Sequence, residues 1–494
     1  MRVYYVKKRL ADFSLVLCLL ILLFAQTSRG YVHNRPTPTL PILISPSDVT
    51  DVFSISAIIQ VHRTLFRIDE NNTPVPDLVK EFDVSADQKT YRFVLLALKF
   101  HDGTALNFTA VQRSLESTLK KRSPGYEKLS TVFGFEPFLK GKIKHLTGLV
   151  PGTTSQEFFI KVFEPSPNLI SILSDFRFSI LPPNLDPKIG LGPYRYESFG
   201  PNQVSLVAVP PASAENPNRV VYSRTNKDEA IKGFEKSFYD DLFMFPIKPA
   251  EGERFQTVGK VDGVVSPRTY LLGINPRPIP DRKNREAIIE KFSAEEIVKN
   301  CYPGNQKTDS VIPPGFMGYL ANLPKSKRSN SRSYGKSLRI GIAKGVDEEA
   351  CVRNQFIQTL NDHQPKIEFV DIDPLLEKWR IGTVDVIFFY LESESILDLF
   401  QFFNPRATFS FGDPLDTSYE KLLEIYSREN NPALKNEKAV ALSMRILDAK
   451  TVFPLFHPLQ YLIYNKRYQR MRVGISSPTF VRFKEFRREN LNDL

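Results

Sequence analysis

The sequence has few of the residues that build metal sites. Among its 494 residues there are three cysteines, one tryptophan and six histidines. Each histidine stands alone, without a second His or Cys at metal-ligand spacing: His33, His62, His101, His145, His363 and His457. We therefore expect no metal and no other cofactor.

Cysteine is too scarce for a disulfide framework. Only Cys301 and Cys351 lie beyond the N-terminal region. These two could pair in an oxidising compartment, but a fold of this size does not depend on one bridge. The sequence leaves open whether they meet.

Catalytic motifs are also missing. There is no phosphate-binding glycine loop, nucleophile elbow or HExxH helix. Acidic neighbours such as Asp240 and Asp241 are common on solvated surfaces. We therefore expect that the protein is not an enzyme. Peptide hydrolysis is a third hypothesis, after the two binding functions given below, and an absence of turnover on model peptides would remove it.

Long apolar runs are absent beyond the N-terminus. Arg2 and Lys7 to Arg9 precede an apolar run from Phe13 to Phe24, which is the pattern of a secretory signal peptide spanning residues 1–30. The alternative is an uncleaved anchor, but a core of about twelve residues is shorter than the roughly twenty that span a bilayer. We predict cleavage after Gly30 and export of the remainder.

Basic residues exceed acidic ones, with a formal charge of +11. Export and the scattering of Lys and Arg along the chain favour a solvated basic surface over a nucleic-acid partner. The one dense run, Lys325 to Lys336, is also rich in Ser and Asn, and indicates an exposed loop.

The stretch from Leu78 to Glu116 is the most informative part of the chain. Thr90 to Leu95 has the β-branched and aromatic residues of a strand, and Asp102-Gly103 is a turn signal. Asn107 is a plausible N-cap for a helix whose apolar face comprises Phe108, Val111, Leu115 and Leu119.

The order of these residues carries a resemblance. Phe82-Asp-Val-Ser-Ala-Asp87, Lys99-Phe-His-Asp-Gly103 and Val111-Gln-Arg-Ser-Leu-Glu116 resemble the bacterial extracellular solute-binding proteins of the oligopeptide, dipeptide and nickel class. Ile189-Gly-Leu-Gly-Pro-Tyr194 is similar to that family's Gly-Thr-Gly-Pro-Tyr, with Leu191 in place of threonine. One departure is the basic run before Ser337, where the family usually has an acidic helix.

The resemblance implies an α/β, two-lobed periplasmic-binding-protein fold of type II, in the large peptide-binding subclass, with mixed sheets and two hinge crossings. The alternation of strands and helices from Leu338 to Tyr390 independently predicts parallel strands covered on both faces. The crossings are expected near Thr269–Asn275 and Phe453–Tyr464. The expected domains are a lobe I core (31–54, 190–268 and 455–494), a lobe I accessory domain (55–189) and lobe II (269–454).

A polar cluster after a buried strand is the candidate site. Val384 to Tyr390 is nearly all apolar, and Leu391 to Ser395 follow at the end where parallel sheets bind ligands. An ordinary solvated loop is the alternative. In peptide-binding relatives this loop has an aspartate, shortly after a tryptophan, that pairs with the peptide's ammonium group.

By that spacing Tyr390 replaces the tryptophan and Ser393 the aspartate, so the charge is missing. Glu392 or Glu394 could supply it from one residue away, although neighbouring side chains of an extended segment point in opposite directions. The predicted ligand-binding residues are thus Tyr390, Glu392, Ser393 and Glu394.

The resemblance implies a periplasmic, monomeric substrate-binding component of an ABC transporter, which captures peptides between two lobes and delivers them to a permease in the inner membrane. A receptor for a nickel chelate, haem or a sugar is the alternative within the same fold. A sensor or interaction module that has lost transport is the alternative from another class.

Overall fold

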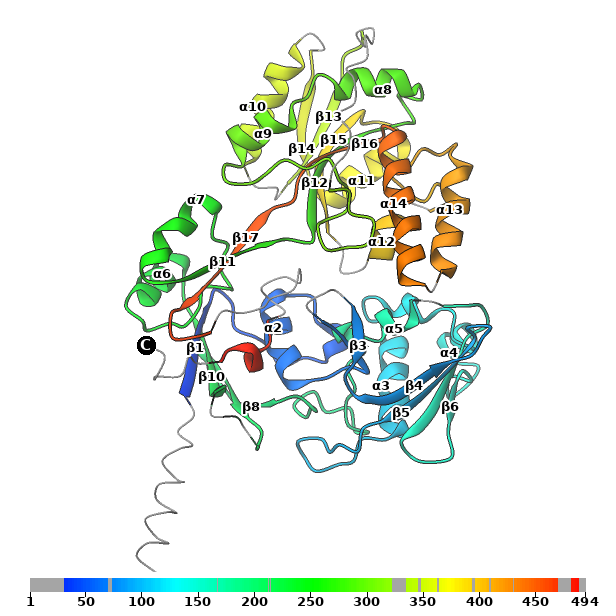
Figure 1. The fold of residues 1–494 in the computed structure, drawn as a ribbon, viewed down its shortest axis with the longest axis vertical. Helices are drawn as coiled ribbons and strands as arrows, with labels where there is room; N and C mark the ends of the chain where they lie inside the picture. The colour runs from blue at the N-terminus through cyan, green and yellow to red at the C-terminus, as the bar shows by residue number, and fades with distance from the viewer. Residues whose placement is uncertain are drawn as a thin grey trace, which may run out of the picture.

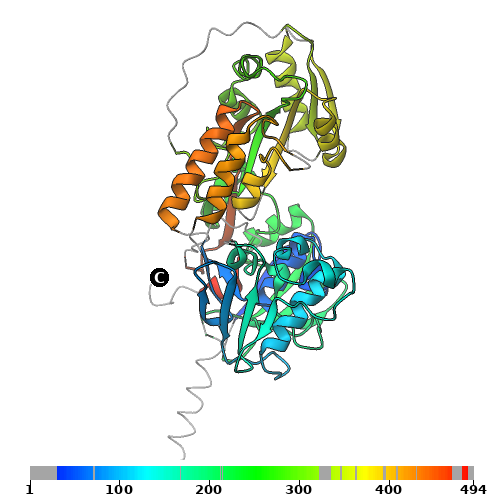
Figure 2. The same cartoon turned by 90° about the vertical axis from the view of Figure 1, so that its right-hand side faces the viewer.

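The computed structural model describes residues 31–69, 73–166, 168–211, 213, 215–321, 335–344, 348–361, 364–392, 396–407, 410–429, 431–469 and 481–487. The predicted signal peptide and most of the basic run from Lys325 to Lys336 lie outside these ranges. Within them, the chain forms two lobes that follow one another along the long axis of the molecule (Figures 1 and 2). The predicted two-lobed α/β fold is therefore confirmed.

The core of lobe I is a four-stranded sheet in the order β1-β10-β9-β8. Its strands are β1 (Tyr31–Thr37), β10 (Pro217–Arg224), β9 (Gln203–Ala208) and β8 (Tyr194–Phe199). Its helices are η1 (Pro46–Asp48), α2 (Val52–Val61), α6 (Lys227–Glu235), α7 (Pro249–Gly252), η4 (Glu253–Thr257) and η7 (Phe483–Glu485). The first strand pairs in parallel with a strand almost 200 residues later, so lobe I closes only after much of the chain has been made.

The accessory part of lobe I has a four-stranded sheet in the order β4-β5-β7-β6, a separate pair of strands, β2 and β3, and its own hydrophobic cluster. Its strands are β2 (Phe66–Ile68), β3 (Pro74–Pro76), β4 (Val79–Val84), β5 (Thr90–Leu95), β6 (Leu149–Pro151) and β7 (Glu157–Lys161). Its helices are α3 (Phe108–Lys121), η2 (Tyr126–Leu129), α4 (Phe135–Leu139), α5 (Leu169–Ile172) and η3 (Phe176–Phe178). The predicted strand, turn and helix are all confirmed here. The Asn107 side chain accepts a hydrogen bond from the backbone N–H of Ala110, which caps α3.

Lobe II is built on a five-stranded sheet in the order β14-β13-β15-β12-β16. Its strands are β12 (Arg268–Ile274), β13 (Arg339–Ala343), β14 (Lys366–Val370), β15 (Val386–Glu392) and β16 (Val452–Phe456). Its helices are α8 (Arg282–Ile289), α9 (Ala294–Cys301), α10 (Glu349–Thr359), α11 (Ile372–Ile381), α12 (Ile396–Gln401), α13 (Thr417–Arg428) and α14 (Pro432–Asp448). As predicted, β13 runs parallel to β14 and β15, whereas β12 runs antiparallel to β15 and β16, which makes the sheet mixed.

Two strands join the lobes. β11 (Gly259–Val265) and β17 (Leu459–Asn465) pair antiparallel over seven residue pairs and pass between the lobes (Figure 1). We call this pair of strands the hinge ribbon. The first crossing therefore lies before the predicted Thr269–Asn275, because that stretch is β12, inside the sheet of lobe II.

Side-chain packing supports slightly different domain boundaries from those predicted. Ala57 and Val61 of α2 pack in the cluster of the lobe I core, whereas Leu455 and Phe456 pack in that of lobe II. The predicted boundaries at 55 and 455 would divide α2 and β16. We propose boundaries after Val61, after Val265 and after Phe456.

Two family motifs distant in sequence contact each other in lobe I. The backbone N–H of His101 donates to the carbonyl of Gly190, and the Gly190 N–H lies 3.2 Å from His101 Nδ1. Nδ1 is therefore the acceptor, so Nε2 carries the proton that it donates to the carbonyl of Gly192, at 2.9 Å. Burial lowers the pKa of His101, so the neutral ring that this pattern requires is the stable form.

Glycine is required where this loop meets α2. The Gly192 N–H donates to the Val61 carbonyl at 2.8 Å. A Cβ at Gly192 would lie 2.2 Å from the Gln60 carbonyl oxygen, and one at Gly190 would lie 1.9 Å from that of Val61. Both neighbours are backbone atoms, which no side-chain rotation can move away.

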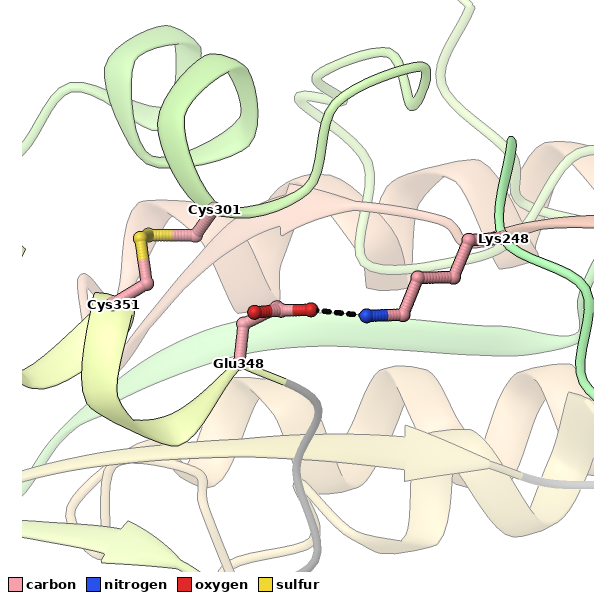
Figure 3. Close-up of a disulfide and its surroundings, with 4 residues drawn as sticks. All are labelled: Lys248, Cys301, Glu348 and Cys351. Atoms are coloured by element: carbon pink, nitrogen blue, oxygen red, sulfur yellow. Dashed lines mark hydrogen bonds and ion pairs between the residues drawn. A yellow bond between two sulfur atoms is a disulfide. The ribbon is translucent and has the colours of Figure 1, made fainter. Parts of the chain in front are cut away.

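A disulfide joins α9 to α10. Cys301 and Cys351, whose pairing the sequence left open, are bonded, with their Cα atoms 5.6 Å apart (Figure 3). In the described part of the chain, no helix has both the length and the apolar character needed to cross a membrane.

We predict that Gly192→Ala destabilises the protein by about 2 to 3 kcal/mol, because the new methyl group must displace the end of α2. Urea denaturation measures this. Gly335→Ala is the matched control, since a Cβ there meets no atom within 4 Å. Equal unfolding midpoints for the two variants would contradict the close approach at Gly192.

We predict that Cys301→Ala combined with Cys351→Ala lowers the free energy of unfolding by about 4 kcal/mol. The bridge closes a loop with a sequence separation of 50 residues, and loop-closure entropy gives a value of this order. Urea denaturation of the variant and of the wild type in reductant measures it, and the two should agree. An unchanged midpoint in both would show that the bridge does not restrict the unfolded chain.

Candidate ligand-binding site

The predicted site lies at one end of the strands of the lobe II sheet, where β15 ends, β12 begins and β16 ends. We call this end of the sheet the lobe II edge. Arg268 of β12 is directly opposite Glu392 of β15, and Tyr270 is opposite both Tyr390 and Phe456. Two of the predicted residues, Tyr390 and Glu392, are thus on this edge. Ser393 and Glu394 lie outside the described residues.

The hinge ribbon enters lobe II at the same edge. β11 ends three residues before Arg268, and β16 is separated from β17 by His457 and Pro458 alone. The Ser266 N–H donates to the Pro458 carbonyl at 2.8 Å, which holds the two connections together. Groups on this edge are therefore directly linked to the strands about which the lobes would turn.

Aromatic rings form the floor of this edge. Tyr270 stacks on Phe456 with ring centroids 4.6 Å apart, and Tyr302 packs on Phe456 at 4.5 Å. Tyr390 packs on Tyr270 at 5.5 Å and is only partly buried, whereas Tyr270 is buried. Tyr390 therefore stands at the margin of a rigid aromatic cluster, with part of its side chain accessible.

Arg268 binds both predicted residues. Its Nη2 and Nε donate to Oε2 of Glu392 at 2.7 and 3.1 Å, and its guanidinium lies over the Tyr390 ring, 4.2 Å from the centroid. Burial alone would lower the pKa of Arg268, but the Glu392 carboxylate raises it above its ordinary value. Arg268 is thus a fixed cation at this site.

Arg268 was not among the residues predicted from the sequence. Its importance depends on the antiparallel register that places it opposite Glu392, 124 residues further along the chain. A single arginine at the start of a predicted strand has no local feature that distinguishes it from the other basic residues. Glu392 lies on the Tyr390 face of β15 because side chains two residues apart share a face.

His457 has a structural environment at the junction between β16 and β17. The Thr269 hydroxyl donates to the Val311 carbonyl at 2.8 Å, so its oxygen accepts from His457 Nδ1, at 3.1 Å. The same Nδ1 is 3.3 Å from the carbonyl oxygen of Arg268. Burial lowers the pKa of His457 to about 4, so the ring is neutral at neutral pH.

One ion pair connects the two lobes on the hinge side. Lys248, which precedes α7 in lobe I, reaches Glu348 at the start of α10 in lobe II (Figure 3). Figure 3 places this pair beside the disulfide that fixes the same end of α10. Because both side chains are largely solvent-accessible, the pair contributes about 0 to 1 kcal/mol.

Two features of the described residues concern other kinds of site. They contain no group of three or more His, Cys, Asp or Glu side chains that could hold a metal ion. A cavity of about 20 Å³ lies at the opposite end of β12, beside Asn275 and Trp379. It has room for one water molecule and cannot hold a peptide.

Solved structures with this architecture define the class of fold. The murein tripeptide-binding protein MppA, in its unliganded open form, matches with a TM-score of 0.79 and 14% identity, over 94% of this chain and 99% of MppA. DppA from Helicobacter pylori, in complex with the peptide STSA, matches with a TM-score of 0.69 and 16% identity, over 94% of this chain and all of DppA. The fold is therefore that of the periplasmic peptide-binding proteins.

The family model for bacterial extracellular solute-binding proteins, family 5, matches residues 73–361, more than half of the chain. The chain belongs to this family, which confirms the resemblance described above. The family binds solutes and is not catalytic, so the prediction that the protein is not an enzyme is also confirmed.

A curated relative supports the same family. A protein of Brucella ovis, named as an ABC transporter peptide-binding protein, is 24% identical over 297 residues. The match covers 53% of this chain and 52% of that protein. The chain thus spans about half the length of the curated relatives that it matches.

We predict that His457 contributes to a loss of stability in acid. Its folded pKa of about 4 lies below the unfolded value of about 6.5, so the unfolded chain binds the proton first as the pH falls. The contribution of His457 to the free energy of unfolding is complete above about pH 6.5 and is about 2 kcal/mol smaller at about pH 5. It is lost as the pH falls towards 4.

Urea denaturation of wild type and His457→Gln, each at neutral pH and at about pH 5, measures this effect. The glutamine retains a hydrogen-bond donor but does not titrate, so its unfolding free energy should fall less between neutral pH and about pH 5. Identical pH dependence in the two proteins would contradict a neutral, buried His457.

Proposed function

We propose that the protein is the ligand-binding component of an ABC importer, that it captures peptides between its two lobes and that it delivers them to a permease in the inner membrane. The observation that carries this proposal is the hinge ribbon, which joins two lobes with separate hydrophobic cores through one pair of strands. Such a connection permits rotation of one lobe against the other. Membership of a solute-binding family supports the same function.

Closure would bury a ligand against the lobe II edge that carries Tyr390. Ligands of mixed α/β sheets lie beyond the carboxyl ends of parallel strands, and β13 and β15 end at this edge. We propose that Tyr390, Glu392, Ser393 and Glu394 contact the ligand there. The backbone of a peptide would supply most polar contacts, with hydrated pockets accommodating its varied side chains.

Peptides are the proposed ligands because the names of similar proteins point to them. The Brucella ovis relative is named as peptide-binding, MppA as a tripeptide-binding protein, and DppA was solved with a bound peptide. The location that follows is the periplasm, with residues 1–30 removed as a signal peptide and the remainder acting as a monomer. These points stay predictions.

We predict that gentle purification of the exported protein, followed by native mass spectrometry and denaturing release, yields a set of small masses that fragment as peptides. Peptide mixtures at about a hundred times the dissociation constant should stabilise the protein by about 2.7 kcal/mol. A thermal-shift assay measures this gain.

The other outcomes separate the alternatives. A single chelate, haem or sugar mass would retain the fold and replace the ligand. An empty protein that shows no thermal shift with peptide mixtures would contradict the transport function and favour a sensor or interaction module.

A further inference from the structure

Two groups at the lobe II edge have the chemistry to bind a ligand's ammonium group. A carboxylate such as that of Glu392 forms a charge-assisted hydrogen bond with an ammonium. The face of an aromatic ring such as Tyr390 attracts a cation. Both belong to β15 and lie on the same face of that strand.

A single side chain already occupies both groups. The Arg268 guanidinium gives two hydrogen bonds to one oxygen of Glu392 and lies over the Tyr390 ring. The side chain of Arg268 is 27% exposed and that of Glu392 is 40% exposed. The pair is therefore at the surface of the site, where a ligand would meet a neutralised carboxylate and a covered ring.

The backbone keeps Arg268 in this position. Arg268 begins β12, which pairs with β15 on one side and with β16 on the other. Its carbonyl oxygen faces His457, and its neighbour Thr269 is buried and hydrogen-bonded to Val311. Arg268 would therefore move with lobe II as a rigid part of the edge when the lobes rotate.

We propose that Arg268 is a specificity-determining residue that closes this subsite to a cationic amino terminus. The site then takes peptides whose amino end is uncharged, such as Nα-acylated peptides, at least as well as peptides with a free amino group. This inference rests on the proposed peptide-binding function.

The physical reason is competition between like charges. An ammonium that approaches Glu392 meets the guanidinium within a few ångströms, where two cations repel. To reach Oε2 of Glu392 or the Tyr390 ring, it must displace an arginine that is held by two hydrogen bonds and an aromatic face. Replacing one charge-assisted bond by another gains little free energy, whereas an acylated amino end avoids the repulsion.

A competition experiment between two peptide libraries, read out by native mass spectrometry, tests this inference directly. Wild-type protein is mixed with equal amounts of a tri- to pentapeptide library and the same library after Nα-acetylation. The measured quantity is the ratio of bound acetylated to bound free peptides. We expect a ratio of one or above for the wild type.

Two variants should move this ratio in opposite directions. Arg268→Gln exposes Glu392 and the Tyr390 ring, so the ratio should fall by up to about fivefold, the effect of one exposed ion pair of about 1 kcal/mol. Glu392→Gln leaves the arginine without its carboxylate, so the ratio should rise. The double variant should return towards the wild-type ratio, because both charges are removed. The shift in either variant remains measurable even if the other folds poorly.

Arg282→Gln is the matched control. Arg282 forms an ion pair with Asp448 elsewhere on lobe II, where the two side chains are 52% and 44% exposed. Its removal should leave the ratio unchanged.

Each remaining outcome decides one claim. A wild type that strongly prefers free amino termini, or an Arg268→Gln variant with an unchanged ratio, overturns the role of Arg268 and leaves the peptide function intact. Binding of neither library by any variant overturns the peptide function, and the inference with it.

Discussion

The hinge ribbon is the constraint on which the rest of this structure depends. Two crossings that are about 200 residues apart in sequence are hydrogen-bonded to each other over seven residue pairs. A strand in such a ladder cannot slide without losing its whole register, so the crossings behave as one band. The lobes can therefore turn about this band, while each lobe remains rigid through its own hydrophobic core.

Hydrogen-bonded polar groups lie beside the ribbon at both ends. In lobe I, the buried Asp241 accepts from His33 Nε2 at 2.6 Å and from Arg35 Nε at 2.8 Å. Burial alone would raise the pKa of Asp241, but Arg35 and the His33 hydrogen bond lower it below its ordinary value. The next residue, Leu242, donates its N–H to Ile463 of β17. In lobe II, Arg268 and His457 flank the corresponding end. The candidate site therefore lies directly beside the lobe II end of the hinge ribbon.

Local elements were predictable because their causes are local. The strand Thr90–Leu95 and the α3 cap at Asn107 were predicted from neighbouring residues, and both are present. The first crossing was misplaced because its strand depends on a partner that is distant in the sequence. Its segment, Gly259–Val265, mixes glycine and charged residues with valine, and forms a strand through its pairing with β17. Whether a segment forms a strand depends strongly on the strands that pair with it.

By itself, the sequence determined the family, the α/β class and the strand that carries Tyr390, because these depend on the order of residues along the chain. Tertiary structure alone decided that Cys301 meets Cys351, that His101 locks the glycine loop and that Arg268 neutralises Glu392. Each of these contacts joins residues at least 50 positions apart. Sheet register and lobe packing bring such residues together, and neither can be read from the residues on one side of the contact.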